Sequence, residues 1–439
     1  MNPATAAPGH APRLRGPLGH RSFRRLAAGR ALVYCANAMA PVVLAFAVLD
    51  ASGSTTALGL VVGARSVANV ALLLAGGVVA DRIRRTLVVR GSALAACGAQ
   101  TAIALSVLLG LTSLPLLTAL SVLNGALAAL SLPASAALTP QTVPAGLIRP
   151  AGALMRMGTN LGMIAGVSLG GAVAAGCGAG WGLACSAAAF GAAAWCFLGV
   201  RTAPADTPGP PPGRTHPLRE LRAGWREFTA RRWVWIVVGQ FMVVNAVVAG
   251  GIQVLGPAVA DATFGRGVWG AVLAAQMAGA LLGGVLAARS QARRILLVGV
   301  AAVAVEALPL VVLAQGGGAL LLGAAMFANG IALEQFGVAW DVSLQENVPA
   351  DRLARVYSYD ALGSFVALPV GEMAAGPIAA HTGTSGALLG GAALVVCATA
   401  AALCSAQVRS LTAAPVVAHS AGPDQSPQSA QSAQPARSA

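Results

Sequence analysis

A long apolar run gives way to a basic turn at Gly76-Gly77-Val78-Val79-Ala80-Asp81-Arg82-Ile83-Arg84-Arg85. A weaker copy, Gly283-Gly284-Val285-Leu286-Ala287-Ala288-Arg289, follows 207 positions later and has Ala288 where the first copy has Asp81. Arginines that directly follow an apolar run are typical of a membrane span that ends on the cytoplasmic side. The two copies suggest that the chain contains a duplicated unit.

The composition of the chain indicates a membrane protein. Of its 439 residues 56% are hydrophobic and only 10% are charged, whereas soluble domains carry about 25% charged residues. The 28 basic residues are all arginine and lie in clusters between apolar runs. This clustering is a topology signal of membrane proteins. We therefore expect a lipid bilayer around the protein, and no nucleic acid as a partner.

The apolar runs predict the fold class. A helix needs about 20 apolar residues to cross a hydrocarbon core of about 30 Å. By this measure the sequence predicts an all-α membrane protein with twelve transmembrane helices. The expected spans are approximately 27–49, 58–80, 87–109, 114–138, 151–175, 181–200, 233–258, 268–288, 295–314, 319–340, 358–380 and 384–406.

The arginines predict the orientation of these spans. With the N-terminus inside, 26 of the 28 arginines fall in cytoplasmic segments or at the adjacent span ends. Arg266 alone lies in an outside loop, and Arg65 lies within the second span. Because basic residues beside span ends stay in the cytoplasm, we expect a multi-pass protein of the cell membrane with both termini cytoplasmic.

The sequence divides into five predicted segments. They are a cytoplasmic N-terminal segment (1–26), a six-helix bundle (27–200), a cytoplasmic linker (201–232), a second six-helix bundle (233–407) and a disordered cytoplasmic tail (408–439). The linker begins rich in proline and then repeats apolar residues at helical spacing: Leu218, Leu221, Trp225 and Phe228. This spacing predicts an amphipathic helix on the inner membrane surface.

The two bundles are predicted to be repeats of one another. Val143-Pro144-Ala145 recurs as Val348-Pro349-Ala350 at an offset of 205, and each copy follows the fourth span of its half. Gly171 matches Gly376 at the same offset. Parallel six-helix repeats with a substrate site between them, near the midplane, characterise a large class of secondary transporters. A small molecule is therefore the expected substrate.

With this arrangement, the chain resembles the major facilitator superfamily over roughly residues 20–408. Between its second and third spans that family carries the pattern G-x-x-x-D-R-x-G-R-[RK]. Arg84 replaces the second glycine of the pattern, and four other positions match: Gly77, Asp81, Arg82 and Arg85. The resemblance implies the major facilitator fold and a cytoplasmic gate that holds the outward-facing state shut. Gly77 permits close helix approach, and Asp81 can accept hydrogen bonds from the amides of a helix N-terminus.

The fifth span carries a glycine-rich face. Its order resembles the G-x-x-x-G-P-x-x-G-G antiporter motif of drug exporters, with Val167 in place of the proline, and the face comprises Gly158, Gly162, Gly166, Gly170 and Gly171. The alternative is that this face only packs against another helix, since small residues at this spacing allow close contact. The segments 24–29 and 348–356 resemble the branch that contains macrolide and siderophore exporters.

Ionisable residues within spans are the candidates for proton or substrate coupling. Such residues are costly in a bilayer and usually face the bundle interior or a wet cavity. The candidates are Glu306, Glu372, Glu334 and Arg65. Burial favours the protonated form of a carboxyl group, which suits reversible proton binding. We expect Asp341 and Asp360 to pair with arginines instead, and Trp340 to lie at headgroup level.

The leading hypothesis is a proton-coupled exporter of a small apolar or amphipathic compound, such as a drug, natural product or siderophore. We expect no enzyme activity, no cofactor, no metal site and a monomeric protein. An ATP-driven pump is excluded within the chain, because a Walker A loop needs a lysine and the sequence has none. Uptake or facilitative transport remains the main alternative. A membrane sensor and a membrane-embedded transferase are more remote ones.

Overall fold

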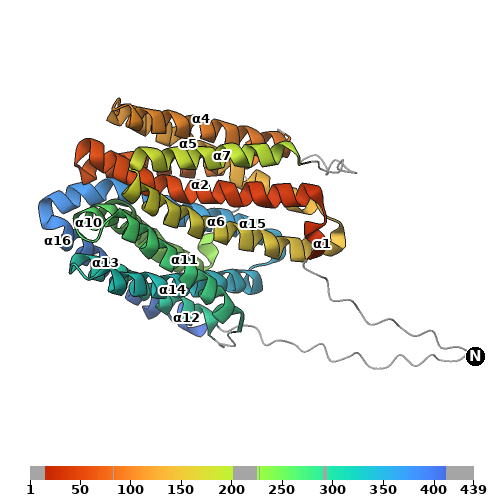
Figure 1. Ribbon diagram of the computed structural model, residues 1–439. Helices are drawn as coiled ribbons and strands as arrows, with labels where there is room; N and C mark the ends of the chain where they lie inside the picture. Colours follow the sequence, from red (N-terminus) through yellow and green to blue (C-terminus); the bar gives the residue numbers. More distant parts are fainter. Residues whose placement is uncertain (1–14, 83, 201–224, 227, 290–293, 412–439) are drawn as a thin grey trace, which may run out of the picture.

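The computed structural model describes residues 15–82, 84–200, 225–226, 228–289 and 294–411 (Figure 1). Its description of residues 73–82 covers the backbone but not the side chains. The described backbone is helical apart from short turns, and it contains no strand. This outcome is expected in a bilayer, where no water is present to pair with free N–H and C=O groups.

The first half of the chain forms six long helices. They are α2 (Arg21–Ser52), α3 (Thr55–Arg82), α4 (Arg85–Leu108), α5 (Leu114–Leu138), α6 (Ile148–Gly176) and α7 (Ala179–Leu198). A short helix α1 (Arg15–Leu18) precedes them, and two 3₁₀ turns, η1 (Thr139–Gln141) and η2 (Ala145–Leu147), join α5 to α6. These helices agree with the six spans predicted for this half.

Several spans of the second half are built from more than one helical piece. They comprise α9 (Arg232–Val248) with the π-helical η3 (Ala249–Leu255) and α10 (Gly256–Ala262), then α11 (Arg266–Arg289), then α12 (Ile295–Ala302) with the 3₁₀ turn η4 (Val303–Glu306) and α13 (Ala307–Ala314), then α14 (Ala319–Asn347), α15 (Ala350–Phe365) and α16 (Leu368–Cys404), followed by the short α17 (Ala406–Ser410). Two of these spans therefore leave α-helical geometry near their middle.

The described residues contain eleven helical stretches that are long and apolar enough to cross a membrane. The last stretch, Val356–Cys404, has 49 residues, which corresponds to about 73 Å of helix, more than twice a hydrocarbon core. It is interrupted at Gly383, where φ is 75° and ψ is 156°. Glycine has no Cβ and adopts this conformation without strain. The stretch thus makes two crossings, and the predicted twelve spans are confirmed.

Left-handed glycines mark one end of the molecule. The described glycines with positive φ, between 61° and 90°, all lie in turns between successive spans: Gly53, Gly110, Gly178, Gly265, Gly316 and Gly383. Three of these turns belong to each half. We call this end of the helices the Asp50 end and the opposite end the Arg85 end. In Figure 1 the Asp50 end lies to the left, with α10 and the bend of α16.

The two halves form two layers of nearly parallel helices. In Figure 1, α2, α4, α5 and α7 lie above, α12, α13 and α14 lie below, and α6 and α11 lie between them. Corresponding helices pack alike: α3 packs on α5 in the first half as α11 packs on α14 in the second. The predicted repeat is therefore visible in the packing.

An Asn-Gly pair marks the same place in both halves. Asn124-Gly125 in α5 and Asn329-Gly330 in α14 are separated by the offset of 205 found in the sequence. Each glycine lies against a backbone carbonyl of the neighbouring helix, that of Arg65 and that of Gln276 respectively, where a Cβ would not fit. Small residues allow this approach. The asparagines have diverged, since Asn124 donates to Gln100 at 3.2 Å and Asn329 accepts from Gln276 at 2.9 Å.

The described contacts between the halves concentrate toward the Asp50 end. There α6 packs on α11 and α3 packs on α16. Gly171 of α6 faces Gly270 of α11, with 2.7 Å between a Cβ placed on Gly171 and the Gly270 Cα. Gly376 of α16 likewise lies against the backbone of Thr56 in α3. The halves thus meet backbone to backbone at this end.

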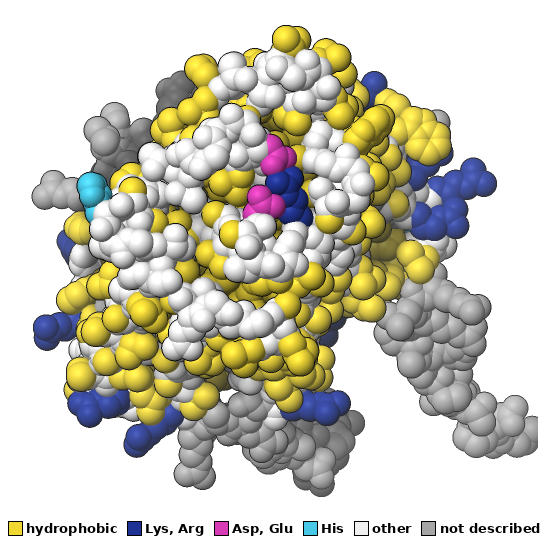
Figure 2. Space-filling view, turned by 60° about the vertical axis from the view of Figure 1, so that its left-hand side comes forward, with side chains coloured by type: hydrophobic (Ala, Val, Ile, Leu, Met, Phe, Trp, Pro, Cys, Tyr) yellow, Lys and Arg dark blue, Asp and Glu magenta, His cyan; other side chains and the backbone are white. Residues whose placement is uncertain are grey.

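An ion-pair cluster covers the same end. Arg266, at the start of α11, donates to both carboxylate oxygens of Asp50 in α2, one of them at 2.8 Å, and its Nε donates to Asp261 of α10 at 2.7 Å. Figure 2 shows this face, with a basic side chain between two acidic ones near its centre and the other basic side chains toward the edges. Arg266, the single arginine predicted to lie in an outside loop, therefore joins the two halves.

The predicted linker is described only in part, because residues 201–224 and 227 lie outside the described residues. Phe228 is 6% exposed, and its ring centroid lies 5.9 Å from that of Tyr359 in α15. The Trp225 ring lies 5.8 Å from the same tyrosine, although Trp225 itself is exposed. This end of the linker is therefore packed on the second half. Most of the predicted tail, residues 412–439, also lies outside the described residues.

Candidate functional site

A cavity of about 390 Å³ lies between the two halves. Both halves line it, with α2, α3 and α6 on one side and α9, η3, α11 and α16 on the other. Most of the lining is apolar, and amides interrupt it at Asn245, Gln253 and Gln276. We call this the central cavity. A space with apolar walls and a few polar groups suits a small amphipathic molecule.

A second cavity of about 270 Å³ adjoins the first. The two share Ala38 and Met163 in their linings, so they lie next to each other. We call the second the arginine cavity, because Arg30 of α2 and Arg65 of α3 line it, together with Tyr34. Of these residues, Arg65 is a predicted coupling residue and Arg30 is not.

Arg30 is the main residue that sequence reasoning missed. It is one of the 26 arginines assigned to cytoplasmic segments and adjacent span ends, although its position lies inside the predicted span 27–49. The structure places its guanidinium carbon 5.7 Å from the Tyr34 ring centroid. Residues four apart share one face of a helix. An arginine one turn inside a span, followed four positions later by a tyrosine, was the available signal.

Glu372 and Arg65 are predicted coupling residues that the structure brings together. Glu372 of α16 is 1% exposed and interacts electrostatically with Arg65 of α3, in the other half. The Ser66 hydroxyl donates a hydrogen bond to the Glu372 carboxylate. The other carboxylate oxygen, Oε2, has no partner among the described residues. The hydrogen bond from Ser66 therefore links the two halves beside the cavities.

Close helix packing fixes the position of Glu372. The Glu372 carbonyl lies where a Cβ on Gly59 would be, and the Met373 side chain lies against Gly63. Both glycines are on α3, one turn apart, on the face that meets α16. Because these two glycines of α3 have no Cβ atom, α3 and α16 can approach each other closely. Any separation of the halves at the Asp50 end must move Glu372 relative to Arg65.

The other two predicted acids lie elsewhere in the second half. Glu306 is 5% exposed at the end of η4, which packs against α14 and α16, and its Oε1 has no partner among the described residues. Glu334 of α14 is partly buried, and a Cβ on Gly284 of α11 would lie 3.6 Å from its Oε1. Neither residue is in the described lining of the two cavities. The structure therefore brings neither of them to Arg65.

The predicted glycine face of α6 divides into two parts. Gly162 lies against the Ala31 carbonyl and Gly166 against the Cys35 carbonyl, both on α2, whereas Gly158 has only the Ala31 Cβ at 3.9 Å. Gly170 faces Met39 of the same helix, with the Met39 Cα at 3.4 Å. Gly171 points away from α2 toward the other half and meets Gly270. Most of this glycine face therefore packs against α2 within the first half. Its last residue, Gly171, contacts the second half.

The predicted cytoplasmic gate lies largely outside the described side chains. Gly77, Asp81 and Arg82 belong to the last turns of α3, whose side chains are not described. Arg85 begins α4 and is exposed. The gate therefore stays a prediction.

The expected role of Trp340 as a headgroup-level anchor is wrong. Trp340 is 6% exposed, its ring stacks on Phe336, and its Nε1 donates to Asp360 at 2.9 Å. Because Asp360 satisfies the indole N–H, this residue can be buried. Asp341 and Asp360 are expected to pair with arginines, but their described hydrogen bonds come from neutral groups. Ser364 also donates to Asp360, and Tyr357 donates to Asp341.

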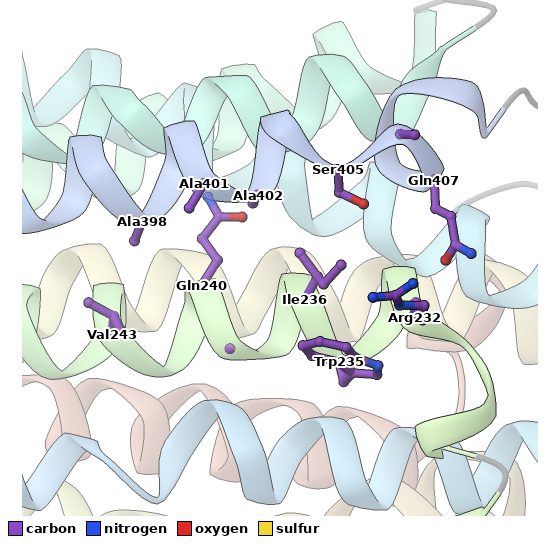
Figure 3. Close-up of a pocket in the computed structure, with 12 residues that line it drawn as sticks. Arg232, Trp235, Ile236, Gln240, Val243, Ala398, Ala401, Ala402, Ser405 and Gln407 are labelled. Carbon is purple, nitrogen blue, oxygen red and sulfur yellow. The ribbon is translucent and has the colours of Figure 1, made fainter.

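A separate groove of about 650 Å³ runs along α9 and the end of α16 (Figure 3). Gln240 reaches across it from α9 and donates to Thr399 at 3.0 Å. Arg232 lies near Gln407 at one end of the groove. All its lining residues belong to the second half. Since it does not lie between the halves, it is not the candidate transport site.

Two six-helix halves related by a repeat, with a cavity lined by both, define a multi-pass membrane transporter. A family model described as Major Facilitator Superfamily matches residues 26–372, and the chain belongs to this family.

The chain is similar to curated exporters over part of its length. It is 30% identical over 248 residues to the enterobactin exporter EntS of Shigella boydii serotype 18 and to that of Escherichia coli O1:K1. The matched region is 55% of this chain and 57% of each exporter. The chain therefore spans little more than half the length of these curated relatives.

Solved transporter structures share the fold. The nucleoside transporter NupG gives a TM-score of 0.70 at 14% identity, over 87% of this chain and 98% of that one. A bacterial homolog of the human lysosomal transporter Spinster, in an inward-facing and unoccupied conformation, gives 0.68 at 18% identity, over 91% and 98%. At these identities the similarity supports the fold alone.

Proposed function

We propose that the protein is a proton-coupled exporter of a small apolar or amphipathic compound, such as a drug, natural product or siderophore. It works by alternating access in the cell membrane, as a monomer with both termini in the cytoplasm. The observation that carries this proposal is the buried carboxylate of Glu372, packed by its backbone against α3 of the other half, next to a cavity that both halves line. The similarity to EntS exporters supports export as the direction.

The contacts between the halves support a loading step from the cytoplasm. They concentrate toward the Asp50 end, which is the outside end in the predicted orientation. A carrier closed at the outside end receives its substrate from the inside. An exporter must load from that side.

Glu372 is the proposed coupling residue, because its charge is linked to the movement of the halves. In the described state its carboxylate lies near Arg65 and accepts from Ser66, both in the other half. Protonation removes the negative charge and weakens this attraction. The charge of Glu372 is therefore linked to the equilibrium between the open and closed states of the Asp50 end.

Everted membrane vesicles test the proposal. The vesicles are energised by respiration, so that their lumen is acidic, and acridine orange reports the pH gradient. Ethidium, erythromycin and a catecholate siderophore are then added in turn. A transported compound should collapse part of the gradient in vesicles that contain the protein, and not in vesicles with Glu372→Gln. A gradient-driven accumulation seen only in right-side-out vesicles would favour uptake instead.

A further inference from the structure

The described linings of the two neighbouring cavities contain basic side chains but no acidic ones. Of the described residues that line them, Arg30 and Arg65 are basic and none is acidic. Glu372 lies near Arg65 but outside the lining. The guanidinium of Arg30 is left as the uncompensated charge of the lining.

Arg30 is held in place along α2. Its guanidinium carbon lies 5.7 Å from the centroid of the Tyr34 ring, which is a cation–π distance. Its Nε is buried and has no hydrogen-bond partner among the described residues. A buried N–H of a charged group without an acceptor is costly. The missing acceptor is a feature that a ligand can supply.

Arg65 faces the same cavity from α3. Its backbone is fixed, because its carbonyl lies against Gly125 of α5, where no side chain intervenes. Amides stand beside the two arginines: Asn37 donates to the Val33 carbonyl at 3.0 Å, and Asn69 donates to the Gly125 carbonyl at 3.2 Å. These bonds fix the amide side chains. The positive groups therefore sit on a rigid wall.

We propose that the arginine cavity is an anion subsite, which binds the acidic group of an amphipathic substrate whose apolar body fills the central cavity. This inference rests on the proposed function, because it takes these cavities as the transport site. A planar guanidinium can donate two parallel hydrogen bonds to a carboxylate or phosphate. The adjoining walls provide Trp269, Leu273 and Met277 for the apolar part.

The sign of the charge also agrees with export. An inside-negative membrane potential drives anions outward and holds cations inside. A carrier with an anion subsite therefore gains a driving force for export from the potential itself. A cationic substrate would lack this advantage and would meet two arginines in the cavity.

Two dyes with one ring system test the subsite. Fluorescein and rhodamine 123 share the xanthene ring, but fluorescein is anionic and rhodamine 123 is cationic. Their binding to the purified full-length protein in nanodiscs is followed by fluorescence polarisation. We expect fluorescein to bind the wild-type protein more tightly than rhodamine 123 does. Arg30→Gln should weaken fluorescein binding by about tenfold, the loss of one charged hydrogen bond, and should not weaken rhodamine 123 binding.

Two further variants separate charge from folding. Arg30→Lys keeps the charge without the planar fork and should retain part of the fluorescein affinity. Arg90→Gln removes an exposed charge on α4, outside both cavities, and should leave fluorescein binding unchanged. Failure of the wild-type protein to bind fluorescein, or an equal loss of both dyes in Arg30→Gln, would overturn the subsite. Because binding is measured without a gradient, an absence of export in vesicles would refute the proposed function and leave this result standing.

Discussion

Gly171 of α6 and Gly270 of α11 face each other across the two halves without a side chain between them. A Cβ on Gly171 would lie 2.7 Å from the Gly270 Cα, and a Cβ on Gly270 would lie 2.9 Å from the Gly171 Cα. Real Cβ atoms do not approach this closely, so both positions must remain glycine in this state. The state that the structure describes depends on this pair.

Gly171→Ala should therefore disfavour the state closed at the Asp50 end. The added methyl group would also meet the Arg266 carbonyl, at 2.8 Å. We expect water-soluble thiol reagents to label a cysteine introduced at Ala174, which is 3% exposed, faster in this variant than in the parent Ala174→Cys protein. Gly176→Ala, on the same helix with no neighbouring atom within 4 Å, is the control. Equal labelling in all three proteins would contradict the prediction.

Gly166→Ala tests the packing part of the same glycine face. A methyl group there would meet the Cys35 carbonyl and force α6 away from α2. We expect a loss of about 1–3 kcal/mol in stability, as for other overpacked sites, seen as a lower melting temperature in detergent. Gly158→Ala, whose nearest neighbour lies at 3.9 Å, should be neutral or slightly stabilising, because alanine favours helix. A normal melting temperature for Gly166→Ala would show that the two helices can separate freely.

Glu372→Gln should abolish the dependence of transport on the pH gradient. Glutamine keeps the size of the side chain and cannot release a proton, so substrate movement should continue only down its own gradient. Proteoliposomes with and without an imposed pH gradient measure this effect. Glu306 is equally buried but lies outside the described cavity linings. Lost coupling in Glu306→Gln, with coupling kept in Glu372→Gln, would transfer the proposed role to Glu306.

Asp81→Asn tests the predicted cytoplasmic gate. The substitution removes the acid of the Arg-rich turn between α3 and α4, and the protein should still insert and fold. We expect the transport rate to fall by about tenfold, a typical size for coupling between conformational states. Asp81→Glu, which keeps the charge, should retain more of the rate than Asp81→Asn. Normal flux in Asp81→Asn would remove the gate hypothesis.

The sequence was sufficient for the spans and for the repeat, because both depend on local composition. Apolar length and arginine position predict each crossing, and Gly383, placed in a predicted loop, is the point where the last helical stretch breaks. Glu372 and Arg65 are also candidates from the sequence, since charges inside spans are rare. Their proximity was not predicted, because it depends on how two distant helices pack.

The remaining site residues depend on tertiary contacts that no single segment contains. In the sequence, Arg30 cannot be distinguished from the other arginines near span ends. Only the structure places it beside Tyr34 and in the lining of the cavity. A tryptophan near a span end is typical of an interfacial anchor. Asp360, 20 positions away, instead provides a buried partner for the indole N–H of Trp340. Gly270 has no sequence signal at all, since its role comes from the opposing Gly171.

A reagent that binds the Asp50–Arg266–Asp261 cluster could control the conformation of the protein without entering the membrane. Its members come from α2, α10 and α11, and Arg266 joins Asp50 of the first half to Asp261 of the second. The cluster is accessible on the face shown in Figure 2. An antibody fragment raised against this three-helix epitope would recognise one state only, because opening of the Asp50 end separates its parts. Such a fragment would act as an inhibitor that never enters the cavity.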